Sequence, residues 1–409
     1  MIAMRGEIGY RRRMAFLVEP GVPRVVVATM LGRLPMGMTS LTLILLVRSG
    51  GDSYVDAGLV TAAFTVGIAL LQPLAAIAVD RYGASPVLCV LGVALPVTMI
   101  LLLLSVNLHA PLVLTLLAAV VAAGTLPPLG PCMRALWRQV VKGPALDRAY
   151  AFEATAQQGP VIAGPFLVTA LVYCTSAGVA LIIAAFAGTM GAILFAKAPI
   201  VAAVARTRSR AADIVVTEHV RLLAQPGLQT ILTTSALMAM SAGAITLSVP
   251  AFAEGHGSAA SAGLILGSFA AGSIFGGMAL TFVRLRADTP FAYTAALAVS
   301  AGTAVLLVVV NTIPWMMVVA WAVGLPTAPS AAISFALLNR HSPAHRITTA
   351  FGFFNSAITG GTAAGSALCG ALLQSFGSAW GFMFAVGLGG LSALVCILRY
   401  RSLQPRKIC

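Results

Sequence analysis

The sequence predicts an all-α integral membrane protein with twelve transmembrane helices in two six-helix bundles. Three observations predict this fold. Of the 409 residues, 59% are hydrophobic and only 9% are charged, whereas a soluble protein carries about 25% charged residues. Apolar stretches long enough to cross a bilayer recur along the chain, and the second half repeats features of the first half. Lipid is therefore the solvent for most of the chain.

Each predicted span has about the 20 apolar residues that a membrane helix needs. The first six are followed by a polar segment and then by six more, and the short connectors contain residues that favour turns. The spans cover residues 22–47, 57–79, 86–106, 111–137, 148–173, 177–197, 228–251, 260–283, 290–310, 313–338, 347–374 and 379–399.

The spans divide the chain into five parts. We expect a cytoplasmic N-terminal segment, an N-terminal six-helix bundle, a cytoplasmic linker, a C-terminal six-helix bundle and a cytoplasmic tail. These parts cover residues 1–21, 22–197, 198–227, 228–399 and 400–409.

The positions of the basic residues predict the orientation. Of the 25 Lys and Arg residues, 22 fall in segments that are cytoplasmic when the N-terminus is inside, as the positive-inside rule requires. We therefore expect a multi-pass protein of the inner or plasma membrane with both termini in the cytoplasm. The same rule explains the net charge of +14 without a nucleic-acid partner.

The two halves carry matching Gly/Pro-rich stretches. AAGTLPPLGP (122–131) in the fourth span corresponds to WAVGLPTAPS (321–330) in the tenth, and GPVIAGP (159–165) in the fifth corresponds to GGTAAGS (360–366) in the eleventh. Paired breaks of this kind indicate a transporter whose site lies where two repeats meet. The predicted helix-breaking residues are Pro127, Gly159, Pro160, Gly164, Pro165, Pro326, Gly360 and Gly361.

The loop after the second span reads DRYG (80–83). Together with twelve spans and a central linker, it resembles the major facilitator superfamily, whose form of this loop is G-x-x-x-D-R-x-G-R-R/K. Asp80, Arg81 and Gly83 match that form. Ala76 replaces its first glycine, and residues 84–85 (Ala-Ser) replace its two basic residues.

The resemblance implies a secondary active transporter that works by alternating access. GRLPMGM (32–38) and RALWRQV (134–140) are similar to segments of bacterial drug- and metabolite-efflux members. It also implies that the 80–83 loop lies under the eleventh span. We expect Asp80 to contact the positive N-terminus of that helix near residues 346–347, with Arg134 or Arg138 nearby, as a cytoplasmic gate.

Arg33 lies about 16 Å along the first span if that span begins at Val22, close to the bilayer midplane. Pro35 follows and frees a backbone carbonyl. One interpretation is that Arg33 binds an anionic or acceptor group of the substrate. The other is a structural arginine whose guanidinium is satisfied by carbonyls or by a carboxylate. Met36, Gln157 and Asn355 are further candidates for the substrate-binding surface.

Glu153 is the only acidic residue clearly inside a span. Glu153 and Arg134 each lie roughly 7–9 Å inside the cytoplasmic edge, on neighbouring antiparallel spans. The two form a permanent salt bridge, or Glu153 takes up and releases a proton during transport. Glu153 is therefore the predicted proton-coupling residue.

Other function classes fit less well. The six cysteines form no CxxC pair, the five histidines fall in loops without ligand spacing, and there is no Walker or HExxH motif, so we expect no catalytic residues, metal or cofactor. A channel does not explain the repeated breaks. The expected partners are a small-molecule substrate, protons and the lipid bilayer, with the protein a monomer.

Proton-coupled efflux of a drug-like or secondary-metabolite molecule by an antiporter, a drug-resistance function, is therefore the predicted activity. An importer or exchanger of a small organic anion, with Arg33 as the anion clamp, is the alternative. A membrane-embedded enzyme is a remote one.

Overall fold

The computed structural model describes residues 21–50, 54–201, 225–256, 261–282, 290–343 and 346–404. These residues form helices joined by short turns, and no strand occurs among them. The all-α fold class is confirmed. The predicted linker lies almost wholly outside the described residues, as do most of the two predicted terminal segments.

The chain forms two compact units. As far as it is described, unit 1 contains residues 21–145, 157–201 and 346–352, and unit 2 contains residues 146–156, 225–343 and 353–404. The division differs from the predicted bundle boundaries at two places. Residues 146–156 of the first half belong to unit 2, and residues 346–352 of the second half belong to unit 1.

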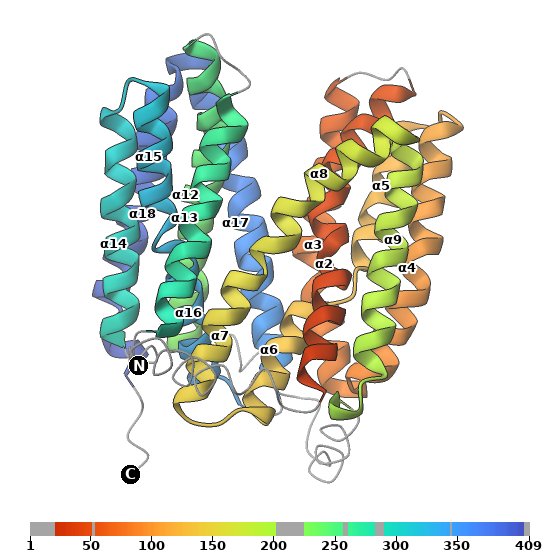
Figure 1. The fold of residues 1–409 in the computed structure, drawn as a ribbon, viewed down its shortest axis with the longest axis horizontal. Helices are drawn as coiled ribbons and strands as arrows, with labels where there is room; N and C mark the ends of the chain where they lie inside the picture. The colour runs from red at the N-terminus through yellow and green to blue at the C-terminus, as the bar shows by residue number, and fades with distance from the viewer. Residues whose placement is uncertain are drawn as a thin grey trace, which may run out of the picture. The chain divides into compact units, whose positions relative to one another are not determined.

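Unit 1 is built on long apolar helices whose facing side chains form one buried cluster, with Leu43, Phe64, Met99 and Leu181 among its members. In Figure 1, α2, α3, α4, α5 and α9 run side by side. The helices of this unit are α2 (Val22–Ser49), α3 (Tyr54–Tyr82), α4 (Ala84–Asn107), α5 (Leu112–Gly124), α6 (Leu129–Val140), α8 (Gln158–Cys174) and α9 (Ala177–Ala196).

Unit 2 has its own apolar cluster, which includes Ile245, Met316 and Phe382. Most of α7 belongs to it, and α17 begins in unit 1 and continues here. The helices are α7 (Pro144–Ala156), α12 (Pro226–Gly255), α13 (Ser261–Phe282), α14 (Pro290–Val309), α15 (Ile313–Gly324), α16 (Thr327–His341), α17 (Ile347–Phe376), α18 (Ser378–Leu398) and the 3-10 helix η3 (Tyr400–Leu403).

Eleven of the predicted spans are long and apolar enough, among the described residues, to cross a membrane. The fifth span is divided between α7, with 13 residues, and α8, with 17 residues. A turn at Gln157 separates the two helices. Together, α7 and α8 make up the fifth of the six spans of the first half.

The two units repeat one packing scheme. In unit 1, α2 packs on α9, α3 on α5, and α4 on α9; in unit 2, α12 packs on α18, α13 on α15, and α14 on α18. The predicted breaks in the fourth and tenth spans also match, because α5 ends at Gly124 and α15 ends at Gly324. Pro127 and Pro326 both lie between the paired helices, as predicted.

The predicted break in the eleventh span is wrong, and the break in the fifth span lies at another position than predicted. The helix α8 runs through Gly164 and Pro165, and α17 runs unbroken through Gly360 and Gly361. The turn in the fifth span lies earlier, at Gln157, so that Gly159 and Pro160 fall in the first turn of α8.

These glycines allow close helix contact instead of breaking a helix. A Cβ on Gly164 would overlap the backbone of Gly37 in α2. In unit 2, a Cβ on Gly361 would lie 2.5 Å from the Ala236 carbonyl oxygen of α12, and one on Gly365 would overlap the Met240 backbone. Small residues that bring backbones together are the usual basis of helix association in lipid.

We expect Gly164→Ala to destabilise the protein by about 1–3 kcal/mol, because backbone atoms of Gly37 would have to move. Gly159→Ala is the matched control, because no atom lies within 4 Å of its added Cβ. Thermal unfolding of the purified protein in detergent measures both variants. Equal melting temperatures for the two would contradict the packing role of Gly164.

Candidate functional site

Asp80 lies in the last turn of α3, and its Oδ2 accepts a hydrogen bond of 2.6 Å from the backbone N–H of Thr349. Thr349 is in the first turn of α17. The first N–H groups of a helix have no partner within the helix, and this end of the helix dipole is positive. The carboxylate therefore caps α17, which confirms the contact that the sequence predicts. Its role as a gate stays a prediction.

The loop that presents Asp80 turns at Gly83. Gly83 has φ 92° and ψ 156°, a conformation that is essentially restricted to glycine. It ends α3 and starts α4 within a single residue, so that Asp80 stays on a regular helix.

Two residues that differ from the family form of this loop, Ala76 and Ser85, make contacts of their own. Ala76 is fully buried, and a Cβ on Gly352 of α17 would lie 2.5 Å from the Ala76 Cβ. In this close contact the alanine is on α3 and the glycine, Gly352, is on α17. The Ser85 hydroxyl donates to the Ala196 carbonyl oxygen at 2.8 Å, which fastens the start of α4 to the end of α9. Arg81 is exposed, with its guanidinium carbon 5.1 Å from the centroid of the Tyr82 ring.

Arg134, on α6, is 3% exposed. Its Nη2 donates to Gln157 Oε1 at 3.1 Å, and its guanidinium carbon lies 5.5 Å from the centroid of the Phe351 ring. Arg134 therefore connects α6, the turn between α7 and α8, and the second turn of α17. Gln157, predicted as a substrate-binding residue, is a partner of Arg134. The pairing of Arg134 with Glu153 stays a prediction.

Glu153 lies on the part of α7 that belongs to unit 2 and is 1% exposed. Tyr150, one turn earlier, is fully buried, and its ring meets Phe335 of α16 edge-on at 6.3 Å between centroids. The carboxylate is thus enclosed by protein. An ionisable residue in this position is costly, and in membrane proteins it usually marks an ion or substrate pathway.

Arg33 is 6% exposed and lies beside the break in the fourth span. A Cβ on Gly130, in the first turn of α6, would lie 2.7 Å from Nη2 of Arg33. The guanidinium and the N-terminal N–H groups of α6 thus bring positive charge to one place. Such a place attracts an anionic group.

Side chains from two other helices satisfy the broken segment itself. Gln72 of α3 donates from Nε2 to the Leu126 carbonyl oxygen at 3.1 Å, and the hydroxyls of Thr98 and Thr125 lie 2.8 Å apart. Sequence reasoning does not assign these roles. The signal for Gln72 is an amide side chain in an otherwise apolar span, but its partner is 54 residues away.

The remaining predicted substrate-binding residues belong to different units. Met36, on α2 of unit 1, is 44% exposed, and Asn355, on α17, is half-buried in unit 2. Met36 therefore presents an apolar, adaptable surface outside the core of its unit.

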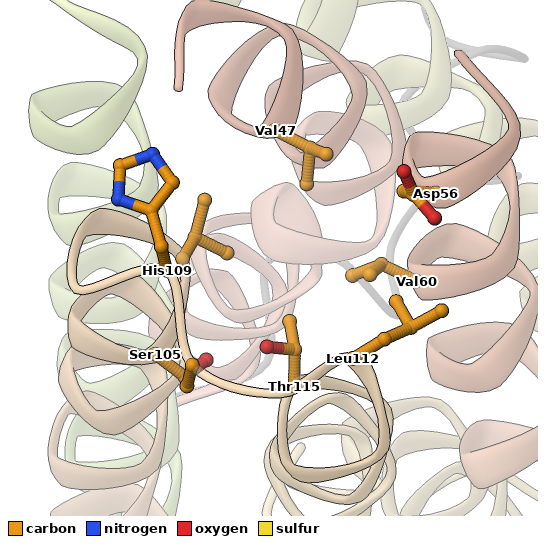
Figure 2. A pocket seen from close by; sticks show the side chains of 9 residues that line it. Val47, Asp56, Val60, Ser105, His109, Leu112 and Thr115 are labelled. Atoms are coloured by element: carbon orange, nitrogen blue, oxygen red, sulfur yellow. The ribbon is translucent and has the colours of Figure 1, made fainter. Parts of the chain in front are cut away.

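A small pocket lies at the other end of unit 1 (Figure 2). It has a volume of about 160 Å³ and is lined by side chains that include Asp56, Ser105, His109 and Thr115. Asp56 and Asp80 are 24 residues apart on α3, a distance of about 36 Å along a helix. The pocket is therefore separate from the surroundings of Asp80.

The model of the Major Facilitator Superfamily matches residues 25–304 and 230–408 of the chain. The chain belongs to the Major Facilitator Superfamily. As a member of this superfamily, with the helical bundles described above, it is a transporter and not an enzyme. In the described part of the chain, no three His, Cys, Asp or Glu residues lie close enough to hold a metal ion.

Solved structures of other transporters share the fold. A crystal structure of a bacterial homologue of the iron transporter ferroportin in an outward-facing state has a TM-score of 0.74 and 14% identity, over 92% of this chain and 98% of that chain. The same homologue with soaked iron gives a TM-score of 0.72 and 13% identity over the same shares.

The human organic anion transporter MFSD10 is also similar in structure. It has a TM-score of 0.68 and 17% identity, over 92% of this chain and 99% of that chain. A search of curated protein sequences finds no match. At these identities the structural likeness shows the fold alone.

We expect Asp80→Ala to release the start of α17, because a hydrogen bond to a charged group contributes about 1.5–3 kcal/mol. A cysteine replacing Thr348, which is 1% exposed, reports the release in a chain whose native cysteines are replaced by serine. Its alkylation by an impermeant maleimide should be at least about tenfold faster in Asp80→Ala. Asp56→Asn, at the opposite end of α3, is the control and should leave the rate unchanged. An unchanged rate in Asp80→Ala would show that the contact does not hold α17.

Proposed function

We propose that this transporter exports a moderately hydrophobic, drug-like or secondary-metabolite molecule in exchange for protons, by alternating access. The observation that carries the proposal is Glu153, a carboxylate that is 1% exposed on a helix segment within the membrane. With Glu153 as the proton carrier, a proton gradient supplies the energy for transport.

The Asp80–Thr349 contact serves as the cytoplasmic gate in this proposal. Its hydrogen bond closes the site when the cytoplasmic side is shut and is lost when that side opens. A loss of about 1.5–3 kcal/mol is small enough for substrate and proton binding to offset, so both states remain accessible. Arg134 and Gln157 support the same closed arrangement, because they link α6 to the turn before α8.

Glu153 carries the proton. The enclosed carboxylate is neutral when protonated and therefore tolerates exclusion from water. It releases the proton when water reaches α7, because the charged form then regains hydration. Release toward the cytoplasm requires the gate to open, which ties proton movement to the Asp80–Thr349 contact.

The exchange of small organic anions is a second candidate, favoured by the position of Arg33. Its guanidinium lies beside Gly130 in the first turn of α6, where the positive end of the helix dipole adds to its charge. A carboxylate of the substrate would be attracted to this place. The exposed Met36 on the same helix favours instead a substrate with an apolar body.

Glu153→Gln is expected to reduce proton-driven efflux to background and to spare substrate exchange, because glutamine keeps the shape of the side chain but cannot release a proton. Everted vesicles measure both activities: collapse of an imposed pH gradient on adding candidate substrates, and exchange of labelled substrate without a gradient. Asp147→Asn, in the first turn of the same helix, is the matched control and should keep both. Full driven efflux in Glu153→Gln would overturn the coupling role.

Arg33→Lys separates the two candidate functions. Lysine keeps the charge but loses the planar, two-pronged geometry that suits a carboxylate. In an anion exchanger, uptake of labelled organic acids should fall at least about tenfold, whereas Met36→Leu should retain it. For the exporter that we favour, vesicles take up no labelled organic acid above background, with or without the Arg33 substitution. Rapid exchange of acids by the unmodified protein would decide for the second candidate.

A further inference from the structure

His256 follows the last residue of α12, at the end of unit 2 that the predicted orientation places outside the cell. The imidazole ring lies between two backbone carbonyl groups. Its Nδ1 is 2.9 Å from the Phe252 oxygen, in the last turn of α12. Its Nε2 is 2.9 Å from the Asn311 oxygen, in the connector between α14 and α15. The ring thus connects two elements of unit 2.

The two contacts require a charged ring if both are hydrogen bonds. A carbonyl oxygen only accepts a hydrogen bond, and a neutral imidazole has a single N–H group, whereas the imidazolium has two. In the neutral ring, one nitrogen lone pair would face a carbonyl lone pair at 2.9 Å. Both contacts are therefore hydrogen bonds only in a ring that carries two N–H groups.

The surroundings of the ring favour a positive charge. The carbonyl groups in the last turn of α12 form the negative end of its dipole. The Phe252 ring lies 4.1 Å from the imidazole, between centroids, with an angle of 34° between the planes, and an aromatic face attracts a cation. Phe252 is itself fixed, because it is 5% exposed and meets Phe382 of α18 edge-on at 6.2 Å.

Few other titratable groups occur at this end of unit 2. The segments that end or begin here, residues 250–262, 307–316 and 370–382, contain one besides His256, which is Glu254. Glu254 is therefore the residue against which a role of His256 has to be tested.

We propose that His256 is a proton-binding site on the outer side of unit 2, and that the bound proton fastens the α14–α15 connector to the end of α12. With the proton bound, the ring donates two hydrogen bonds and joins the two elements. Without it, the ring donates only one hydrogen bond, the lone pair of its other nitrogen faces a carbonyl oxygen, and the link is weakened. His256 is exposed, so the proton can come from the outer solution. The proposal goes beyond the exporter function, because it requires neither Glu153 nor a substrate.

Unit 1 contains a counterpart that differs in one respect. His109, in the connector between α4 and α5, has its Nε2 3.0 Å from the Gly50 oxygen at the end of α2, beside the pocket of Figure 2. By the internal repeat, these are the elements that His256 joins in unit 2, but here the histidine comes from the connector. One ring nitrogen makes this contact among the described residues, and a neutral ring suffices for it. His109 is therefore the internal control.

Hydrogen exchange of the purified, full-length protein tests the proposal. Amides of residues 309–313 and 315 are followed at about pH 5 and pH 8, on either side of the range near 6.5 in which histidine titrates, with correction for intrinsic exchange rates. In the unmodified protein, protection should be at least about fivefold greater at the lower pH. His256→Gln should lose this difference, and its melting temperature should fall below that of the unmodified protein at the lower pH only.

The matched variants are His109→Gln and Glu254→Gln, both of which should keep the pH-dependent protection. The proposal is overturned if His256→Gln keeps it as well, or if Glu254→Gln abolishes it. No transport is measured here. A failure of this experiment therefore leaves the Glu153 proposal untouched, and a failure of Glu153→Gln in vesicles leaves the His256 site untouched.

Discussion

No water satisfies a backbone group in the bilayer core, so each amide or carbonyl that a helix end leaves open needs a partner from the protein. This constraint accounts for the polar contacts that matter most in the chain. Where the fourth span breaks, Gln72 donates to the Leu126 carbonyl oxygen. Where the eleventh span begins, Asp80 accepts from Thr349. The first of these contacts stabilises the break in the fourth span, and the second holds the start of α17.

Lipid imposes a second constraint, on how helices associate, and glycine satisfies it. Lipid supplies no hydrophobic force between helices, so association depends on close packing. Both units use glycine for this at corresponding helix pairs. In unit 1, Gly67 of α3 lies against the Val120 backbone of α5, and in unit 2, Gly324 of α15 lies against the Phe269 backbone of α13. Close helix contact is thus a recurring role of glycine in the described part of the chain.

Predictions from the sequence succeed where they depend on local properties or on a family pattern, and they fail where a glycine admits a neighbouring helix. The apolar stretches predict the spans because length and hydropathy are local properties. The Asp80 contact is predictable because the loop resembles a family pattern. In contrast, GPVIAGP and GGTAAGS read as helix breaks, although α8 and α17 run through them. A glycine that breaks a helix and one that admits a neighbouring helix look alike in a single sequence. Only the position of the partner backbone distinguishes them.

Different residues lie beside the broken span in each unit, and Arg33 is one of those in unit 1. In unit 2, Gly276 of α13 leaves room for the Leu325 carbonyl at the break between α15 and α16, and the hydroxyls of Ser300 on α14 and Ser330 in the first turn of α16 lie 3.1 Å apart. An arginine within a span costs about 2.5–3.5 kcal/mol on insertion scales. The helix α12, which corresponds to α2, contains no arginine, so this cost is particular to unit 1, and substrate binding by Arg33 stays a prediction.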